Sequence, residues 1–163
     1  MRIVGILILS LTPLLFGLDY RSTIKKRRDL FLNLKDFVVF VKEQIRFCGR
    51  ERNEILALSD INPKFNDSFF IVLKKSIKNG ENLTKILENY NDIRLKHKET
   101  VEINAFFAEL GKTDTEGQIN HCDYYINLFS QMGEKLNNSY TTKSRLSLGL
   151  SISLMAAMFI IMI

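Results

Sequence analysis

Three consecutive residues, Gly111-Lys112-Thr113, come closest in this sequence to a known site for chemistry. The same residue types close the phosphate-binding loop of P-loop nucleotidases, where backbone amides and a lysine cradle the phosphates. That loop also requires a glycine five positions earlier and a strand that leads into it. Phe106 occupies the glycine position, and the residues before Gly111 have helical periodicity. We therefore predict that no nucleotide binds here.

Side chains that could bind a metal or act as nucleophiles are few and poorly spaced. The histidines are His97 and His121, and the cysteines are Cys48 and Cys122. Metal ligands on one helix face lie three or four residues apart, whereas His121 and Cys122 are neighbours. The cysteines lack CxxC spacing, and small secreted domains use several disulfides rather than one pair. No catalytic triad signature is present, so we predict no metal site, no cofactor and no enzymatic activity.

Both ends of the chain differ in composition from the part between them. Residues 1–18 and 146–163 are almost entirely apolar, and Arg2 is the only charged side chain in either segment. Their lengths are close to the roughly 20 residues that a helix needs to cross the hydrocarbon core of a bilayer. No small-residue cleavage motif follows the first segment, so it is expected to remain uncleaved. We predict transmembrane helices at 1–18 and 146–163, with a helical bundle domain at 19–145.

The net charge of +5 is concentrated just after the first apolar segment. Lysines and arginines beside a membrane segment stay on the cytoplasmic side and attract anionic lipid. Both ends of the middle domain carry such residues, so we predict a cytoplasmic bundle with both chain termini on the far side of the membrane. A nucleic-acid partner is not expected, because the basic residues are not spread over a folded face. The juxtamembrane basic residues are Arg21, Lys25, Lys26, Arg27 and Arg28.

Apolar residues of the middle domain recur every three or four positions, which is the period of an amphipathic helix. This pattern, together with the low content of Pro and Gly, predicts an all-α protein: a six-helix bundle flanked by the two transmembrane helices. Gly49 and the pair Asn79-Gly80 are expected to end the first and third helices. A capping box of Thr113 and Glu116 is expected to open the sixth. The helices are predicted at about 22–47, 50–58, 67–79, 81–94, 98–110 and from 113 onward.

The predicted sixth helix has no strong breaker before the second apolar segment, so we expect one long helix. Its apolar residues alternate at spacings of three and four, which is the heptad pattern of a coiled-coil seam. The pattern allows two interpretations: packing inside the bundle, or a coiled coil between copies that makes the chain a homo-oligomer. The seam residues are Ile119, Cys122, Ile126, Phe129, Gly133, Leu136 and Tyr140.

The loop before the sixth helix contains Leu110 and Gly111, followed by Asp114 and Gln118. These residues match the pattern L-G-x-x-D-x-x-x-Q, and with the order of the elements they resemble the stage III sporulation protein AB family. That family is similar to the F-type platform proteins of type II secretion and type IV pilus systems. We expect a tight turn at Gly111, a favourable charge from Asp114 at the helix N-terminus, and a bond across the loop from Gln118.

The resemblance implies a non-enzymatic platform in the mother-cell membrane around the forespore, within a secretion-like channel complex between the two cells. It implies two kinds of partner, a secretion-type cytoplasmic ATPase and the other membrane subunits of the sporulation channel. The motif loop would either fix the geometry of the bundle or dock a partner. The alternative function is a membrane-tethered dimeric signalling or sensor module that uses the heptad seam.

Overall fold

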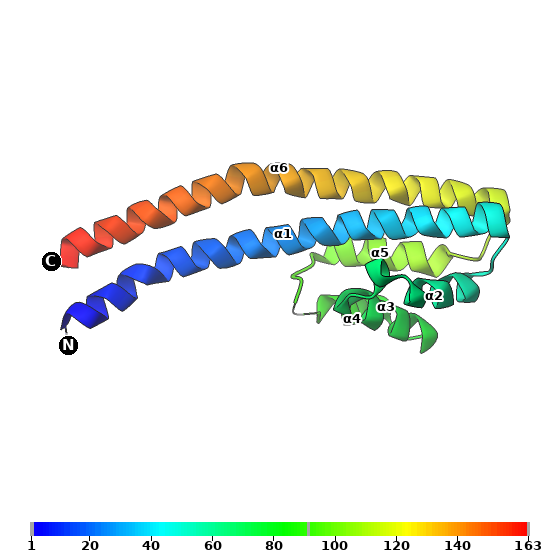
Figure 1. The fold of residues 1–163 in the computed structure, drawn as a ribbon, viewed down its shortest axis with the longest axis horizontal. Helices are drawn as coiled ribbons and strands as arrows, with labels where there is room; N and C mark the ends of the chain where they lie inside the picture. Colours follow the sequence, from blue (N-terminus) through cyan, green and yellow to red (C-terminus); the bar gives the residue numbers. More distant parts are fainter. Residues whose placement is uncertain (1, 91, 163) are drawn as a thin grey trace. The chain divides into compact units, whose positions relative to one another are not determined.

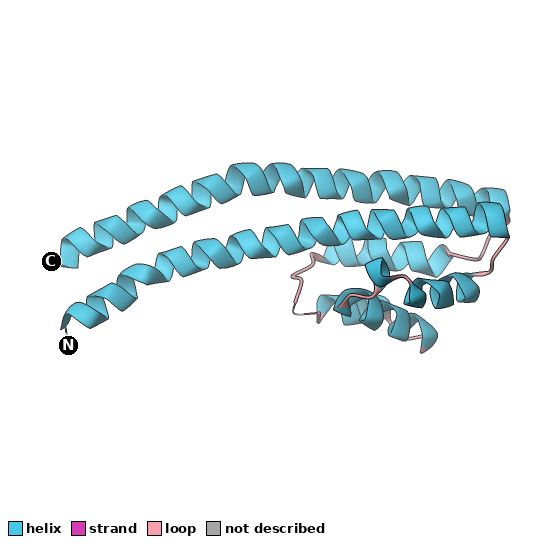
Figure 2. Ribbon diagram, viewed as in Figure 1, coloured by secondary structure: helices cyan, strands magenta, loops and turns pink. Residues whose placement is uncertain are grey.

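The computed structural model describes the backbone of residues 2–90 and 92–162 (Figure 1). No strand occurs among these residues, which confirms the predicted all-α class (Figure 2). Side chains are described for residues 15, 17–90, 92–142, 149–153, 155–157 and 160. The helices are α1 (Arg2–Cys48), α2 (Arg52–Ile61), the 3-10 helix η1 (Pro63–Phe65), α3 (Ser68–Lys78), α4 (Leu83–Glu88), α5 (His97–Glu109) and α6 (Thr115–Met162).

The chain forms two compact units. The first, called the helix pair below, consists of Met1–Arg28 and Glu134–Ile163, and the second, called the bundle, consists of Asp29–Gly133. In the helix pair, α1 and α6 run antiparallel, so the start of α1 and the end of α6 lie at the same end of this unit (Figure 1). The bundle holds α2 to α5 together with the last part of α1 and the first part of α6.

Among the described residues, no helix is long and apolar enough to cross a membrane. The predicted transmembrane helices at 1–18 and 146–163 are therefore not confirmed. Most side chains of the first segment and many of the second lie outside the described residues. In α1 the first described side chain is Leu15, and the charged Asp19 follows about one helical turn later. The described part of the first apolar segment is therefore short.

Phenylalanine rings form the centre of the bundle. Phe37 of α1 is fully buried, and its ring centroid lies 5.3 Å from the centroids of Phe65 in η1 and Phe70 in α3. The ring of Phe107 in α5 lies 5.8 Å from the same ring. Aromatic pairs at these separations add stability beyond that of burying their area. Phe37 therefore joins four elements of the bundle at one point.

Local signals in the sequence identify the ends of α1 and α3. α1 ends at Cys48, and Gly49 follows with a φ of +59°. α3 follows Asp67, whose carboxylate accepts a hydrogen bond from the Phe70 amide at 2.9 Å. It ends before Gly80, which has a φ of +66°. These boundaries agree with the predictions.

The predicted fourth helix is too long. α4 ends at Glu88 rather than near Arg94. The Asn89 side chain donates a hydrogen bond to the Lys85 carbonyl at 2.9 Å. Short polar side chains that bond to nearby backbone groups compete with helix propagation, and this bond closes the last turn of α4. Apolar periodicity alone could not predict that stop. A second element absent from the prediction is η1, which forms at the expected break around Pro63.

The heptad seam of α6 packs inside the chain. Phe129 lies against Phe31 of α1 with 6.0 Å between the ring centroids, and both rings are fully buried. One turn further along α6, Gly133 is buried against Leu32. Cys122 is also fully buried. These contacts agree with the first interpretation of the seam, packing between helices of one chain.

Candidate interaction site

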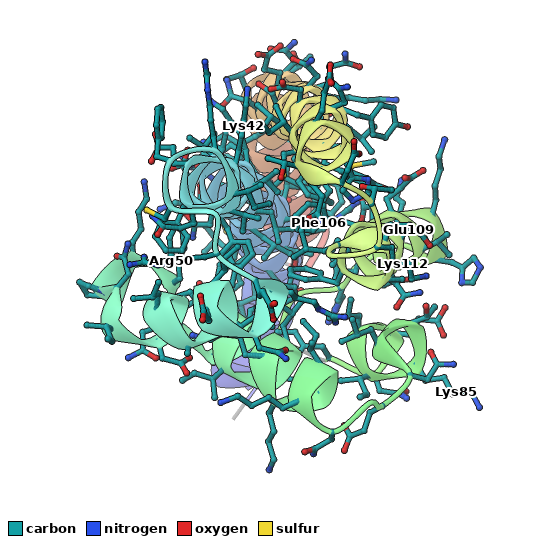
Figure 3. All side chains as sticks on the ribbon, turned by 90° about the vertical axis from the view of Figure 1, so that its right-hand side faces the viewer. Lys42, Arg50, Lys85, Phe106, Glu109 and Lys112 are labelled. Carbon is teal, nitrogen blue, oxygen red and sulfur yellow. The ribbon has the colours of Figure 1, made fainter. Side chains whose placement is uncertain are left out.

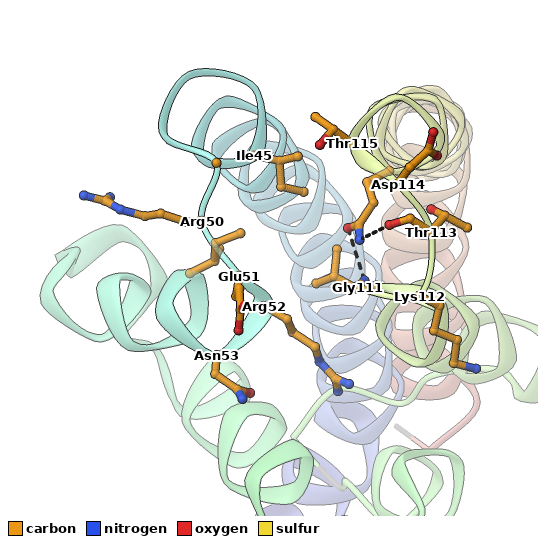
Figure 4. A pocket seen from close by; sticks show the side chains of 14 residues that line it. Ile45, Arg50, Glu51, Arg52, Asn53, Gly111, Lys112, Thr113, Asp114 and Thr115 are labelled. Atoms are coloured by element: carbon orange, nitrogen blue, oxygen red, sulfur yellow. Dashed lines mark hydrogen bonds between the residues drawn. The ribbon is translucent and has the colours of Figure 1, made fainter.

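One side chain closes the loop between α5 and α6. Gln118 accepts a hydrogen bond from the Gly111 amide at 3.1 Å and donates one to the Thr113 carbonyl at 3.0 Å (Figure 4). The bond across the loop that was expected for Gln118 is thus confirmed. Gly111 has a φ of +88°, a conformation that glycine adopts without steric cost. Leu110, which precedes it, is buried in the core. The motif residues therefore build a locally bonded turn anchored at one end.

Asp114 caps α6, so the predicted capping box of Thr113 and Glu116 is wrong. The Asp114 carboxylate accepts a hydrogen bond from the Gly117 amide at 3.0 Å. Because α6 begins at Thr115, Asp114 occupies its N-cap position. Gly117 was not singled out by the sequence analysis, yet a Cβ atom there would lie 2.8 Å from Asp114 Oδ1. That approach is too close for a β-carbon, so the cap depends on glycine.

Replacing Gly111 by alanine is expected to destabilise the chain by about 1–2 kcal/mol, because an L side chain is strained at its positive φ. Thermal unfolding of the purified chain, followed by circular dichroism, measures this loss. Lys112→Ala is the matched control, since Lys112 is exposed and its ion pair with Glu109 is a surface pair. Equal stability of the two variants would contradict the strained turn.

The motif loop forms one wall of a groove in the bundle with a volume of about 570 Å³ (Figure 4). The opposite wall is the turn between α1 and α2, together with the first residues of α2. All four motif residues line the groove, so the structure brings them together. The lining residues are Ile45, Gly49, Arg50, Glu51, Arg52, Asn53, Ile55, Leu110, Gly111, Lys112, Thr113, Asp114, Thr115 and Gln118.

Two of the basic side chains that line the groove have partners outside its centre. Arg50 donates a hydrogen bond to Gln44, and Lys112 forms an ion pair with Glu109 at 3.0 Å. Arg50 belongs to the wall formed by the α1–α2 turn, and in Figure 4 its side chain points away from the motif loop. In the end-on view, Arg50 and Lys112 lie on opposite sides of Phe106 (Figure 3).

Arg52 is the basic residue that lies against the motif loop. A β-carbon at Gly111 would lie 3.4 Å from the Cβ atom of Arg52, so the two residues pack closely. The Arg52 Nε atom is buried and has no hydrogen-bond partner among the described residues. Sequence reasoning missed Arg52, because it is far from the motif in the chain and no local pattern relates the two.

The juxtamembrane basic residues lie on α1 in the helix pair and fall into two groups. Arg21 donates a hydrogen bond to the Tyr140 hydroxyl at 2.9 Å, and the Arg28 guanidinium lies 5.3 Å from the centroid of the same ring. Lys25 and Lys26 are exposed, and Arg27 is partly buried. Arg21 and Arg28 therefore contact α6. Whether any of them contacts lipid stays a prediction.

The histidines and cysteines lie apart from the groove lining. His121 stacks on Phe106 with 5.4 Å between the ring centroids. His97 is exposed and contacts Glu88. Cys48 is exposed and Cys122 is buried, and neither forms a disulfide. Within the described residues, no group of three His, Cys, Asp or Glu side chains could hold a metal ion.

Alkaline pH is expected to destabilise the bundle through Cys122. Burial, reinforced by the charge of Asp123, raises the pKa of its thiol from 9.0 to about 11. The unfolded state therefore loses this proton at a lower pH than the folded state, so stability is full below pH 9.0 and falls as the pH rises through about 11. Denaturant titrations across this range measure the loss. In Cys122→Ala the loss should be smaller, and an unchanged slope would contradict the assignment.

The chain was compared with models of protein families, with curated proteins and with solved structures. A sequence model of stage III sporulation protein AB matches residues 2–163, a range that contains both units and all the motif residues. No curated protein and no solved structure matches the chain significantly.

Proposed function

Because the chain belongs to the stage III sporulation protein AB family, we propose that it is a non-enzymatic membrane platform of the channel complex between mother cell and forespore. The predicted resemblance is confirmed by the match to residues 2–163, and the protein is a sporulation protein by family. That match is the observation that carries the proposal. The likeness of the family to secretion F-type platforms supports the more specific role.

Membrane attachment through both ends of the chain is part of this proposal. Its support is the apolar composition of residues 1–18 and 146–163. The described apolar side chains of the helix pair add to it, since Leu15, Leu150 and Ile160 are 63, 71 and 75% exposed. Such exposure of large apolar side chains on a paired helix is typical of a surface that another apolar phase covers. In this arrangement the exposed Lys25 and Lys26 would meet anionic lipid headgroups.

We further propose that the groove beside the motif loop docks the cytoplasmic ATPase of the complex. A loop held by Gln118, Gly111 and the Asp114 cap is preorganised, so little conformational entropy is lost when a partner binds it. The sensor alternative is less well supported, because the seam that a dimer would use is occupied by contacts such as Phe129 with Phe31.

A pull-down from membranes of sporulating cells tests the platform role. An affinity tag inserted between Gly80 and Glu81 would lie in the exposed turn between α3 and α4, outside the groove lining. We expect the tagged chain to recover a secretion-type ATPase and several small membrane proteins. Cells with the untagged chain are the control for background binding.

The same preparation gives outcomes that oppose the proposal. Recovery of the chain alone, as a stable dimer, would favour the sensor module instead. Release of the chain from membranes by alkaline carbonate would contradict attachment through apolar helices, because integral segments resist that wash. Recovery of the membrane subunits without an ATPase would retain the platform and remove the ATPase from the proposal.

A further inference from the structure

We propose that the groove is a carboxylate-binding site, in which Arg52 pairs with an aspartate or glutamate presented by a segment of a partner protein. The partner role rests on the function proposed above, whereas the binding of a carboxylate can be measured on this chain alone. In this proposal the group that binds in the groove is a carboxylate, and the residue that recognises it is Arg52.

The first reason is the state of the Arg52 side chain. Its Nε atom is buried, yet it has no hydrogen-bond partner among the described residues. A buried donor on a charged group is costly to leave unpaired, and native structures satisfy nearly all such groups. The carboxylates of Glu51 and Asp114 also line the groove, but no ion pair between either of them and Arg52 is present among the described residues. The terminal nitrogens of the same guanidinium also have no partner among the described residues and are not enclosed, so an acceptor in the groove can bind the guanidinium there.

The second reason is the room beside that donor. The groove holds about 570 Å³, which is enough for a side chain and its neighbours rather than for a single water molecule. Its Arg52 wall lies opposite the motif loop, and Gln118 and Asp114 are already used in bonds that hold that loop. The loop thus has a fixed shape, while the guanidinium retains free bonding capacity. A guanidinium binds a carboxylate with two parallel hydrogen bonds, which also fixes the orientation of the ligand.

The composition of the lining favours a carboxylate over a phosphate. Glu51 and Asp114 place negative charge at the groove, which opposes a dianionic phosphate more strongly than a monoanionic carboxylate. Ile45, Ile55 and Leu110 supply apolar lining. An aspartate or glutamate flanked by aliphatic residues would fit both features. The occupant is therefore an acidic segment of a protein.

Titration of the full-length chain in detergent micelles tests the site directly. The probe is the peptide N-acetyl-Leu-Asp-Leu-amide, and the readout is the NMR resonance of the Arg52 Nε–H group. We expect a saturable shift of this resonance, because the bonds form on the terminal nitrogens of the same guanidinium. The matched peptide with asparagine in place of aspartate should cause little shift, and inorganic phosphate should bind more weakly than the aspartyl peptide. No shift with the aspartyl peptide, or an equal shift with the asparagine peptide or phosphate, would overturn the assignment.

Variants extend the test to the partner. Arg52→Gln should lower the recovery of the partner in the pull-down by about thirtyfold or more, as expected when one member of a buried charge pair is removed. Arg52→Lys should lower it less, since lysine keeps the charge but lacks the planar fork. The control is Arg46→Gln, an exposed arginine on α1 that does not line the groove. Circular dichroism of each variant separates misfolding from lost recognition.

The two proposals fail in different ways. If the wild-type chain recovers no partner, the platform function fails, while the peptide titration still decides the carboxylate site. If the wild-type chain and Arg52→Gln recover the same partner equally well, the platform stands and the role of Arg52 is overturned.

Discussion

Replacing Phe37 by alanine is expected to lower the free energy of unfolding of the bundle by about 3–5 kcal/mol. The ring is fully buried and lies 5.3 Å from both Phe65 and Phe70, and 5.8 Å from Phe107. Its removal deletes apolar contacts in four elements at once and leaves a cavity that the surrounding rings cannot fill without leaving their positions. Since a domain of this kind has a total stability of about 5–15 kcal/mol, the variant should lose a large fraction of its stability.

Phe47 provides the matched control for this variant. It lies on the same helix, but its side chain is 75% exposed. Phe47→Ala should therefore change stability by less than about 0.5 kcal/mol. Urea titrations of both variants in detergent micelles, followed by circular dichroism, compare the two losses of unfolding free energy. Similar losses would show that the aromatic centre described for the bundle does not carry its stability.

Gly133→Leu is the second change for which we expect a large effect, a loss of about 1–3 kcal/mol from overpacking. A β-carbon at Gly133 would already lie 3.1 Å from the nearest methyl carbon of Leu32 and 3.9 Å from the Cβ atom of Phe31. Leucine adds three more carbons in the same direction. Because α1 and α6 approach closely here, the Leu32 side chain must move aside, and the new leucine competes with it for the space beside Phe31.

Gly149→Leu is the control, because Gly149 also lies in α6 but a β-carbon added there would meet no atom of the described residues within 4 Å. There, leucine replaces a poor helix former without a clash, so stability should be unchanged or slightly higher. The melting temperature should thus fall for Gly133→Leu and stay the same or rise slightly for Gly149→Leu. A destabilised Gly149→Leu with an unaffected Gly133→Leu would contradict the close approach of α1 and α6.

If Arg52 recognises a partner carboxylate, the motif loop acts by shaping a site rather than by supplying its charge. Both polar atoms of the Gln118 side chain form hydrogen bonds within the loop, and a carboxylate oxygen of Asp114 accepts the hydrogen bond that caps α6. Substitution of these residues would alter the shape of the groove and the stability of the turn together. Arg52→Gln, in contrast, would alter recognition with the loop bonds intact.

The sequence by itself determined the all-α class, most helix positions and the family. Apolar periodicity and the stops at Gly49 and Gly80 depend on residues within one or two turns, so they can be read locally. The bond of Gln118 across its loop belongs to the same class, because its partners Gly111 and Thr113 are a few positions away. The resemblance through the motif likewise needed only a short segment.

Tertiary structure decided which distant residues meet. The approach of Arg52 to Gly111, the packing of Phe129 on Phe31 and the contact of Arg21 with Tyr140 join segments far apart in the chain. A helical repeat specifies which face of a helix is apolar but not which other helix covers it, since many pairings bury similar areas. The groove exists only where the α1–α2 turn and the motif loop come together, so its shape and its arginine depend on packing that local pattern does not encode.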